Sequence, residues 1–190
     1  MDDRKFDKKS ADDWITMIEG EGEKIREQDI YPRLKKWIWD NDLTNVLDLG
    51  CGQGVCSSKM PGDTLYTGVE PSPHLLQRAK ILYPEKNFIN GSAYKIPLPD
   101  QSLDGVFSVA LWHLLSDLDR ASRELSRVLR DGGHFLIITA DANHEIWQRS
   151  HDRLFLHSEN ELCESWKKYN LKPTSIGAFR CFWYFEGRKV

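Results

Sequence analysis

Short apolar runs recur along the middle of the chain, and each is followed by a stretch of mixed polarity. The runs are too short for helices, are rich in valine, isoleucine, leucine and phenylalanine, and are bounded by turn-forming residues. They predict five buried strands, at Asn45–Leu49, Tyr66–Glu70, Phe88–Ile89, Leu103–Ala110 and His134–Ala140.

The stretches between these runs place apolar residues at helical spacing and carry recognisable helix ends. Ser72 is expected to cap a helix that has Pro73 at its first position. Asp131-Gly132-Gly133 is expected to stop the helix before the fifth strand. The predicted helices are Glu21–Asp40, in which Pro32 starts a new helix, Val55–Lys59, Ser72–Leu82, Asp117–Arg130 and Ser158–Tyr169.

Strands and helices therefore alternate, which is typical of a parallel sheet covered on both faces. Right-handed crossovers make such a sheet doubly wound, with the ligand at the carboxyl ends of its first strands. The last part of the chain is less regular. Asp141–Leu156 is interpreted as a loop or short helix, Ser158 and Glu161 form a capping box, and Lys172–Phe185 predicts a hairpin.

Composition narrows the class of protein. The 190 residues suit one domain, and 40% hydrophobic with 29% charged residues is a globular balance. A formal net charge of -3 gives no field that favours nucleic acid, and no apolar run has the length of a membrane span. The polar start lacks a secretory signal, and the four cysteines form no CxxC pair. We therefore expect a cytoplasmic protein with reduced thiols and no metal.

The most informative segment is the turn after the first strand, where Gly50, Gly52 and Gly54 alternate with other residues. Glycine suits a sharp turn or a close ligand, and such a strand–turn–helix unit places backbone N–H groups at a ligand site. Asp48 precedes the turn, and Glu70 ends the next strand, where an acidic residue accepts ribose hydroxyls. The alternatives are an ordinary tight turn and a solvated charge at a strand end.

The run Asp48-Leu49-Gly50-Cys51-Gly52-Gln53-Gly54 resembles motif I of the class I S-adenosylmethionine-dependent methyltransferases. Gly68–Ser72 is similar to their ribose-binding motif. Gly91–Asp104 resembles their adenine loop and the entry to strand 4. Glu124–Leu136 resembles the helix, turn and strand 5 that follow, so the resemblance covers roughly residues 40 to 140 in the family's order.

This resemblance implies an α/β fold: a single doubly wound, Rossmann-like domain with helices on both faces of a mostly parallel seven-stranded sheet. The family's strand order is 3-2-1-4-5-7-6, with the last pair antiparallel. Residues 1–40 would form a helical lid and residues 41–190 the methyltransferase domain.

The resemblance also implies a cofactor, S-adenosylmethionine, which leaves as S-adenosylhomocysteine. Gly50, Gly52 and Gly54 would line its methionyl end together with Cys51, which small size at a crowded turn explains better than reactivity. Asp48 would bind the methionyl ammonium group. Glu70 would accept both ribose hydroxyls.

Further positions are expected to contact the adenine and ribose groups of the same cofactor. Pro71 would give the adenine an apolar wall beside Ser72, which belongs to the ribose motif. Ser92 stands where many relatives have an acidic acceptor for the adenine amino group, so a backbone N–H from Ala93 is expected to help. Tyr94 either covers the adenine edge or has a packing role at a partly exposed position.

Two further residues are assigned to the methionyl group. The Ala110 carbonyl would accept from its ammonium. The segment Gly20–Arg26 is similar to a lid segment of some small-molecule methyltransferases, so Arg26 would pair with the methionyl carboxylate. The alternative is that Arg26 is a solvated charge on a helix. Trp14 and Tyr31 would close an acceptor pocket.

His113 is the candidate general base, since a neutral imidazole accepts a proton near pH 7. The alternative is a structural histidine packed beneath the following helix.

These features favour a methyltransferase with a small-molecule acceptor, working as a monomer or homodimer, without nucleic-acid or membrane partners. A second hypothesis is a regulatory protein that binds S-adenosylmethionine or S-adenosylhomocysteine without turnover. A nicotinamide-dependent oxidoreductase is disfavoured because its Gly-x-Gly-x-x-Gly fingerprint is replaced here by alternating glycines.

Overall fold

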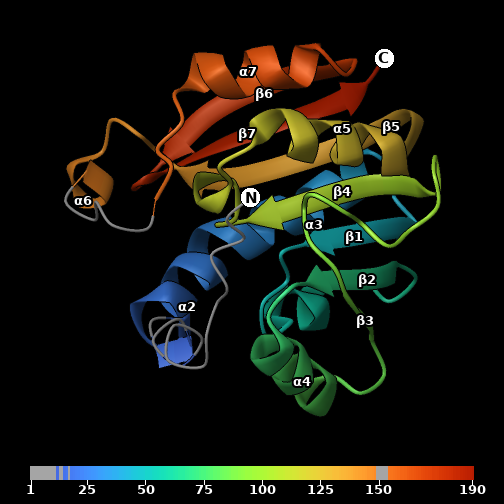
Figure 1. The fold of residues 1–190 in the computed structure, drawn as a ribbon. Coiled ribbons are helices and arrows are strands. Elements are labelled where there is room, and N and C mark those ends of the chain that lie inside the picture. The colour runs from blue at the N-terminus through green and yellow to red at the C-terminus, as the bar shows by residue number, and fades with distance from the viewer. Residues whose placement is uncertain (1–11, 13–14, 17, 149–153) are drawn as a thin grey trace. The chain divides into compact units, whose positions relative to one another are not determined.

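The computed structural model describes residues 12, 15–16, 18–148 and 154–190 (Figure 1). Its seven-stranded sheet has the order β3-β2-β1-β4-β5-β7-β6, as the family resemblance implied. The pairs β1–β2, β2–β3 and β4–β5 are parallel, and β5–β7 and β6–β7 are antiparallel. The strands are β1 (Asn45–Leu49), β2 (Leu65–Glu70), β3 (Asn87–Asn90), β4 (Leu103–Val109), β5 (Leu129–Ala140), β6 (Leu171–Phe179) and β7 (Phe182–Lys189).

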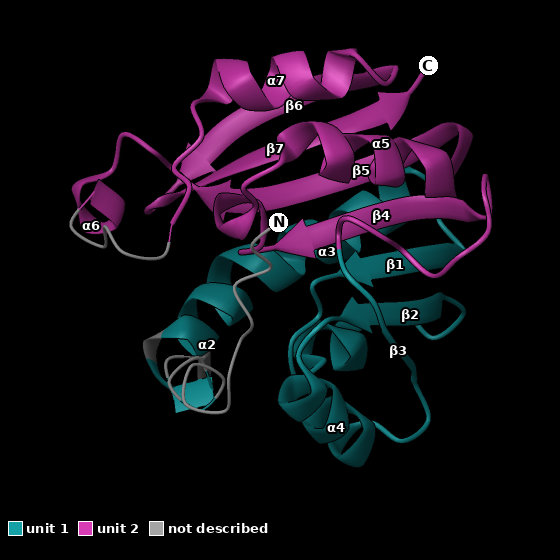
Figure 2. Ribbon diagram, viewed as in Figure 1, with its two compact units in different colours: residues 1–92 teal, residues 93–190 magenta. Residues whose placement is uncertain are grey.

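The chain forms two compact units, residues 1–92 and residues 93–190 (Figure 2). A lid over residues 1–40 and a domain over residues 41–190 stay a prediction. Across the described ranges, no helix has the length and apolar character needed to cross a membrane.

The first unit begins with a helical segment. It consists of η1 (Ile18–Gly22), α2 (Glu23–Ile25), η2 (Arg26–Ile30) and α3 (Tyr31–Asp40), with η1 and η2 forming π-helical turns. Pro32 stands in the first turn of α3, as predicted, because that position needs no N–H donor. One face of this segment is buried, with Ile30, Tyr31, Leu34, Trp37 and Ile38 at helical spacing.

Two short helices follow the first strands of this unit: η3 (Val55–Lys59), a 3-10 helix, and α4 (Pro73–Leu82). α4 packs against β2 and β3 through a face that includes Leu75, Leu76 and Ala79. Ser72 occupies the N-cap position of α4, but its side chain makes no capping hydrogen bond. The prediction that Ser72 is the N-cap residue and that Pro73 begins the helix is confirmed, and the Ser72 N–H donates to Glu70.

The second unit contains η4 (Trp112–Leu114), α5 (Leu118–Val128), α6 (Glu145–Gln148) and α7 (Glu159–Lys167). α7 begins with the predicted capping box between Ser158 and Glu161. α5 packs against both α7 and β5. The second unit has an aromatic core in which the rings of Trp112, Trp166 and Phe185 pack edge to face, and both tryptophans are fully buried.

The start of β5 differs from the sequence prediction. The strand begins at Leu129, directly after α5, and includes Asp131-Gly132-Gly133, which was expected to be a turn between elements. Leu103 pairs with Leu129 and Gly105 pairs with His134, so the extra residues form a bulge. Gly132 adopts a φ of 75° there. The predicted hairpin near the C-terminus is confirmed as β6–β7, which turns at residues 180–181.

Candidate cofactor-binding site

The glycine turn after β1 has the backbone that the sequence indicated. Gly50, Gly52 and Gly54 have φ values of 77°, 56° and 78°, a region that other residues rarely adopt. A Cβ on Gly54 would also lie 2.6 Å from Cζ of Phe88. Both the backbone conformation and the close packing therefore require glycine at this turn.

The amides of this turn do not face outward as donors. The N–H groups of Gly50 and Cys51 donate to the Val69 carbonyl at 2.8 and 3.2 Å, and Gly54 donates to Cys51 O at 2.9 Å. The Gly52 N–H donates to Glu70 Oε2 at 3.0 Å. The prediction that backbone N–H groups here await a ligand is therefore wrong for these four residues, because the tight turn folds back onto β2.

Glu70 is the carboxylate that holds this turn in place. Its side chain is 6% exposed, and its other oxygen, Oε1, accepts from the Ser72 N–H at 2.9 Å. Burial raises the pKa of Glu70 to about 6, against the two backbone hydrogen bonds that lower it. Each ionised oxygen has capacity for one more hydrogen bond, so the group fits a pair of ribose hydroxyls.

Asp48 is buried beside Glu70 and has one hydrogen-bond partner that sequence reasoning missed. The Tyr66 hydroxyl donates to Asp48 Oδ2 at 2.8 Å. Burial raises the pKa of Asp48 to about 7, with the Glu70 charge adding to the rise, while Tyr66 and Arg26 oppose it. Because Asp48 and Tyr66 lie on neighbouring parallel strands, only the register of β1 against β2 could have revealed this pair.

These raised pKa values predict a pH-dependent stability. The folded protein binds the Asp48 and Glu70 protons more tightly than the unfolded chain does, so their contribution to the free energy of unfolding falls as pH rises from about 4 to about 7. Asp48→Asn removes the larger part of this pH-dependent contribution to the free energy of unfolding. We expect its urea-unfolding free energy to fall less than that of the wild type between about pH 5 and 8. Identical pH profiles would contradict the burial of an ionisable Asp48.

Arg26 lies in the π-helical turn η2 and is buried, with 6% exposure. Its charge lowers the pKa of Asp48, which places the guanidinium near that carboxylate. Within the described part of the chain, its Nη1 has no hydrogen-bond partner. Since a buried guanidinium nitrogen without a partner is costly, Arg26 fits a ligand carboxylate better than it fits the alternative of a solvated helical charge.

The remaining predicted residues of this unit differ in exposure. Pro71 is exposed, Ser92 is half-buried and Ser72 is buried. Burial raises the pKa of the Cys51 thiol far above its usual value, which makes Cys51 unreactive. Their contacts with a cofactor stay predictions.

In the second unit, Ala93 is buried and Tyr94 is tied to the start of α5. The Tyr94 hydroxyl accepts from the N–H groups of Ser116 and Asp117 at 2.8 and 3.2 Å. Arg120 Nε donates to the Tyr94 carbonyl at 3.1 Å. Of the two roles left open for Tyr94, these contacts favour packing, although its half-buried ring still has an exposed part.

Ala110 follows β4 with a φ of 59°, a left-handed conformation that is unfavourable for alanine. The Ala110 N–H donates to Ile138 O at 2.8 Å, which holds this conformation against β5. Such strain is typical of functional positions. The carbonyl role of Ala110 toward the methionyl ammonium stays a prediction.

His113 is buried and locked in one tautomer. The Ala140 N–H donates to its Nδ1 at 3.1 Å, so Nδ1 is an acceptor and the ring proton sits on Nε2. Thr139 Oγ1 lies 3.1 Å from the same nitrogen. Burial lowers the pKa of His113 to about 4, with the His157 charge contributing. The lone pair that a general base needs is therefore already engaged, and the geometry favours the structural role.

If the role of His113 is structural, we expect the protein to tolerate its substitution by asparagine. In His113→Asn, the amide oxygen can accept from the Ala140 N–H where Nδ1 does now. We expect His113→Asn to lose less free energy of unfolding than His113→Leu, in which that N–H is left unpaired at a cost of about 1–3 kcal/mol. Chemical denaturation of the three proteins checks this. A stable His113→Asn variant that loses methyl transfer would restore the general-base hypothesis.

Two further sequence expectations concern the surroundings. Trp14 lies outside the described residues, and Tyr31 is buried on the helical segment rather than open to a pocket. Among the described residues, no group of histidine, cysteine, aspartate or glutamate side chains could hold a metal ion.

Fold and site together define a class: an α/β protein with a glycine turn after its first strand and a buried acid ending its second. A family model described as a methyltransferase domain matches residues 47–137. This match, the methyltransferase relatives and the fold support a class I S-adenosylmethionine-dependent methyltransferase.

Similar proteins have varied descriptions. An uncharacterised methyltransferase of Mycobacterium bovis is 33% identical over 108 residues, 56% of this chain and 44% of that one. A fatty-acid O-methyltransferase of Mycolicibacterium smegmatis is 32% identical over 118 residues, 58% of this chain and 43% of its own. The chain thus spans less than half the length of either relative. The PH0226 protein of Pyrococcus horikoshii has the same fold, with a TM-score of 0.77 at 18% identity over 91% of this chain and 93% of that one.

Proposed function

We propose that this protein transfers the methyl group of S-adenosylmethionine to a small-molecule acceptor. The observation that carries the proposal is the charge arrangement in the first unit. Glu70 is held by the Gly52 and Ser72 amides, Asp48 is buried nearby, and Arg26 has a buried nitrogen without a partner. A ligand with a carboxylate, an ammonium group and two vicinal hydroxyls satisfies all three side chains.

The residues divide the work of binding. Arg26 pairs with the methionyl carboxylate, Asp48 with the ammonium group, and Glu70 with the ribose hydroxyls. When bound, S-adenosylmethionine supplies a sulfonium whose methyl group is ready for in-line attack, so the protein needs mainly to position the acceptor and exclude water. This accounts for a site without an obvious general base.

The acceptor is proposed as a small molecule because the relatives with stated substrates include a fatty-acid O-methyltransferase and a hydroquinone methyltransferase. The alternative, a regulatory protein that binds the cofactor without turnover, is supported by the engaged lone pair of His113. We propose a cytoplasmic monomer or homodimer, in line with the free cysteines of the described chain.

Calorimetric titration with S-adenosylhomocysteine and with NAD tests the cofactor. We expect binding of S-adenosylhomocysteine in the micromolar range and none of NAD. Binding of NAD alone would overturn the proposal. Product formation with a panel of fatty acids, phenols and amines then separates the enzyme from a regulatory protein, since the latter binds the cofactor but methylates nothing.

A further inference from the structure

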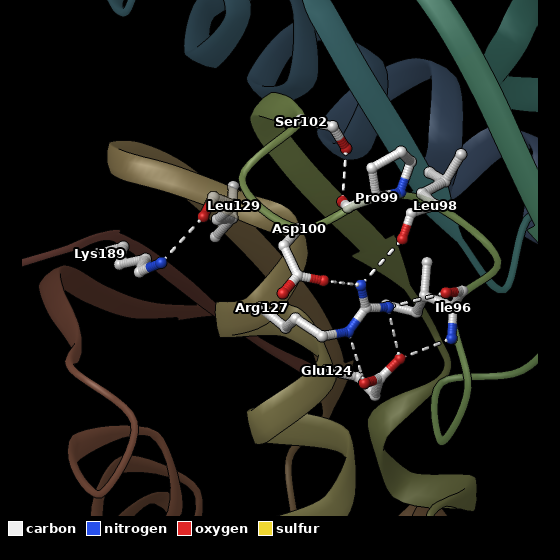
Figure 3. Close-up of polar contacts among 9 residues, drawn as sticks. All are labelled: Ile96, Leu98, Pro99, Asp100, Ser102, Glu124, Arg127, Leu129 and Lys189. Carbon is white, nitrogen blue, oxygen red and sulfur yellow. Dashed lines mark hydrogen bonds and ion pairs between the residues drawn. The ribbon is translucent and has the colours of Figure 1, made fainter.

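Arg127 on α5 makes a hydrogen bond with every N–H of its guanidinium group (Figure 3). Nε and Nη2 donate to the two oxygens of Glu124, each at 2.8 Å. Nη2 also donates to Ile96 O at 2.8 Å, and Nη1 donates to Leu98 O at 2.9 Å and to Asp100 Oδ1 at 2.7 Å. Arg127 thus clamps the irregular segment that leads into β4.

Glu124 holds the same segment from the acceptor side. Its Oε2 accepts from the Ile96 N–H at 2.8 Å, as Figure 3 shows. The hydrogen bond from Arg127 lowers the pKa of Glu124, so the carboxylate is ionised at neutral pH. Both the N–H and the carbonyl of Ile96 are therefore bound by one ion pair on α5.

Arg120 extends this pattern by one turn of the helix. Arg120, Glu124 and Arg127 lie on one face of α5, at spacings of four and three residues. They bind the main chain at Tyr94, Ile96 and Leu98, which are spaced by two residues. The polar face of α5 therefore holds the irregular backbone of residues 94–98 in place.

We propose that Arg127 and Glu124 are positioning residues that make the site selective for adenine. This rests on the proposed function and on the expectation from the sequence that the Ala93 N–H binds the adenine ring. Residues 94–98 follow directly, and Pro97 and Pro99 have no N–H with which to fix this stretch in a sheet. The ion pair on α5 therefore sets where the Ala93 N–H points.

The test compares S-adenosylhomocysteine with S-inosylhomocysteine, whose hypoxanthine ring has a donor at N1 where adenine has an acceptor. An N–H aimed at N1 favours adenine, so the wild type is expected to prefer the adenine ligand by roughly tenfold or more. Arg127→Lys keeps the charge but loses the fork of hydrogen bonds. We expect calorimetry to show a roughly tenfold loss for S-adenosylhomocysteine and little change for S-inosylhomocysteine.

Matched variants separate positioning from simple stability. Arg130→Lys alters an exposed arginine that pairs with Asp104 and does not touch residues 94–98, so its ligand preference should equal that of the wild type. Glu124→Gln replaces Arg127→Lys if the latter fails to fold. An unchanged preference in a folded variant, equal weakening of both ligands, or no preference in the wild type would overturn the positioning role. A wild type that binds neither ligand would instead remove the proposed function.

Discussion

Gly54→Ala is expected to destabilise the protein by about 2–5 kcal/mol. A left-handed backbone costs alanine about 1–2 kcal/mol, and overpacking adds about 1–3 kcal/mol. Both effects apply at Gly54, where φ is 78° and the new Cβ would lie 2.6 Å from the Phe88 ring. Urea unfolding followed by circular dichroism measures the loss.

Three other glycines separate the two causes. Gly132 has a φ of 75° with nothing within 4 Å, so Gly132→Ala should show the backbone cost alone. Gly68 has no left-handed backbone, but its Cβ would lie 2.7 Å from Cys51 Sγ and from Phe88, so Gly68→Ala should show the packing cost alone. Gly62→Ala meets neither and should stay within about 0.5 kcal/mol of the wild type. Equal stability of the Gly54 and Gly62 variants would contradict this account of the turn.

Glu70→Gln is expected to weaken the binding of S-adenosylhomocysteine by about 1–3 kcal/mol, roughly 5- to 150-fold. Both oxygens of Glu70 accept a backbone N–H, so the amide NH₂ of glutamine must face either Gly52 or Ser72, donor against donor. The variant loses the charge offered to the ribose and distorts the turn beside it. Calorimetric titration gives the dissociation constants.

Glu85→Gln is the matched control, because it removes the same charge from an exposed position between α4 and β3. Its affinity should equal that of the wild type. If Glu70→Gln bound S-adenosylhomocysteine as tightly as the control does, Glu70 would have no role toward the ribose.

The sheet could be predicted because its strands are apolar runs bounded by glycine, proline and charged residues. β1 matches its predicted range, and the capping box of α7 is local to Ser158 and Glu161. The start of β5 could not be read in the same way. Asp131-Gly132-Gly133 is a sound turn signal, and it lies inside β5 only because Leu129 before it pairs with Leu103 and His134 after it pairs with Gly105.

The candidate site was predictable by residue type and less so by contact. Glycine at positions 50, 52 and 54 follows from the backbone that the turn needs. The hydrogen-bond acceptors of the turn's amides include Val69 and Glu70, which come close to the turn only when β1 and β2 pair. The Tyr66 hydroxyl on Asp48 and the Ala140 N–H on His113 have the same origin, since no local pattern announces a partner on another strand.

The burial of Trp112 and Trp166 has a practical consequence for these measurements. Indole emission is blue-shifted in a dry core. Both rings are buried in the second unit together with Trp183, whereas the described part of the first unit has one buried tryptophan, Trp37, beside the 66% exposed Trp39. A shift of the emission maximum during unfolding will therefore report mainly on the second unit. Comparing that fluorescence transition with the circular dichroism transition of a Gly54 variant will reveal whether residues 1–92 can melt first.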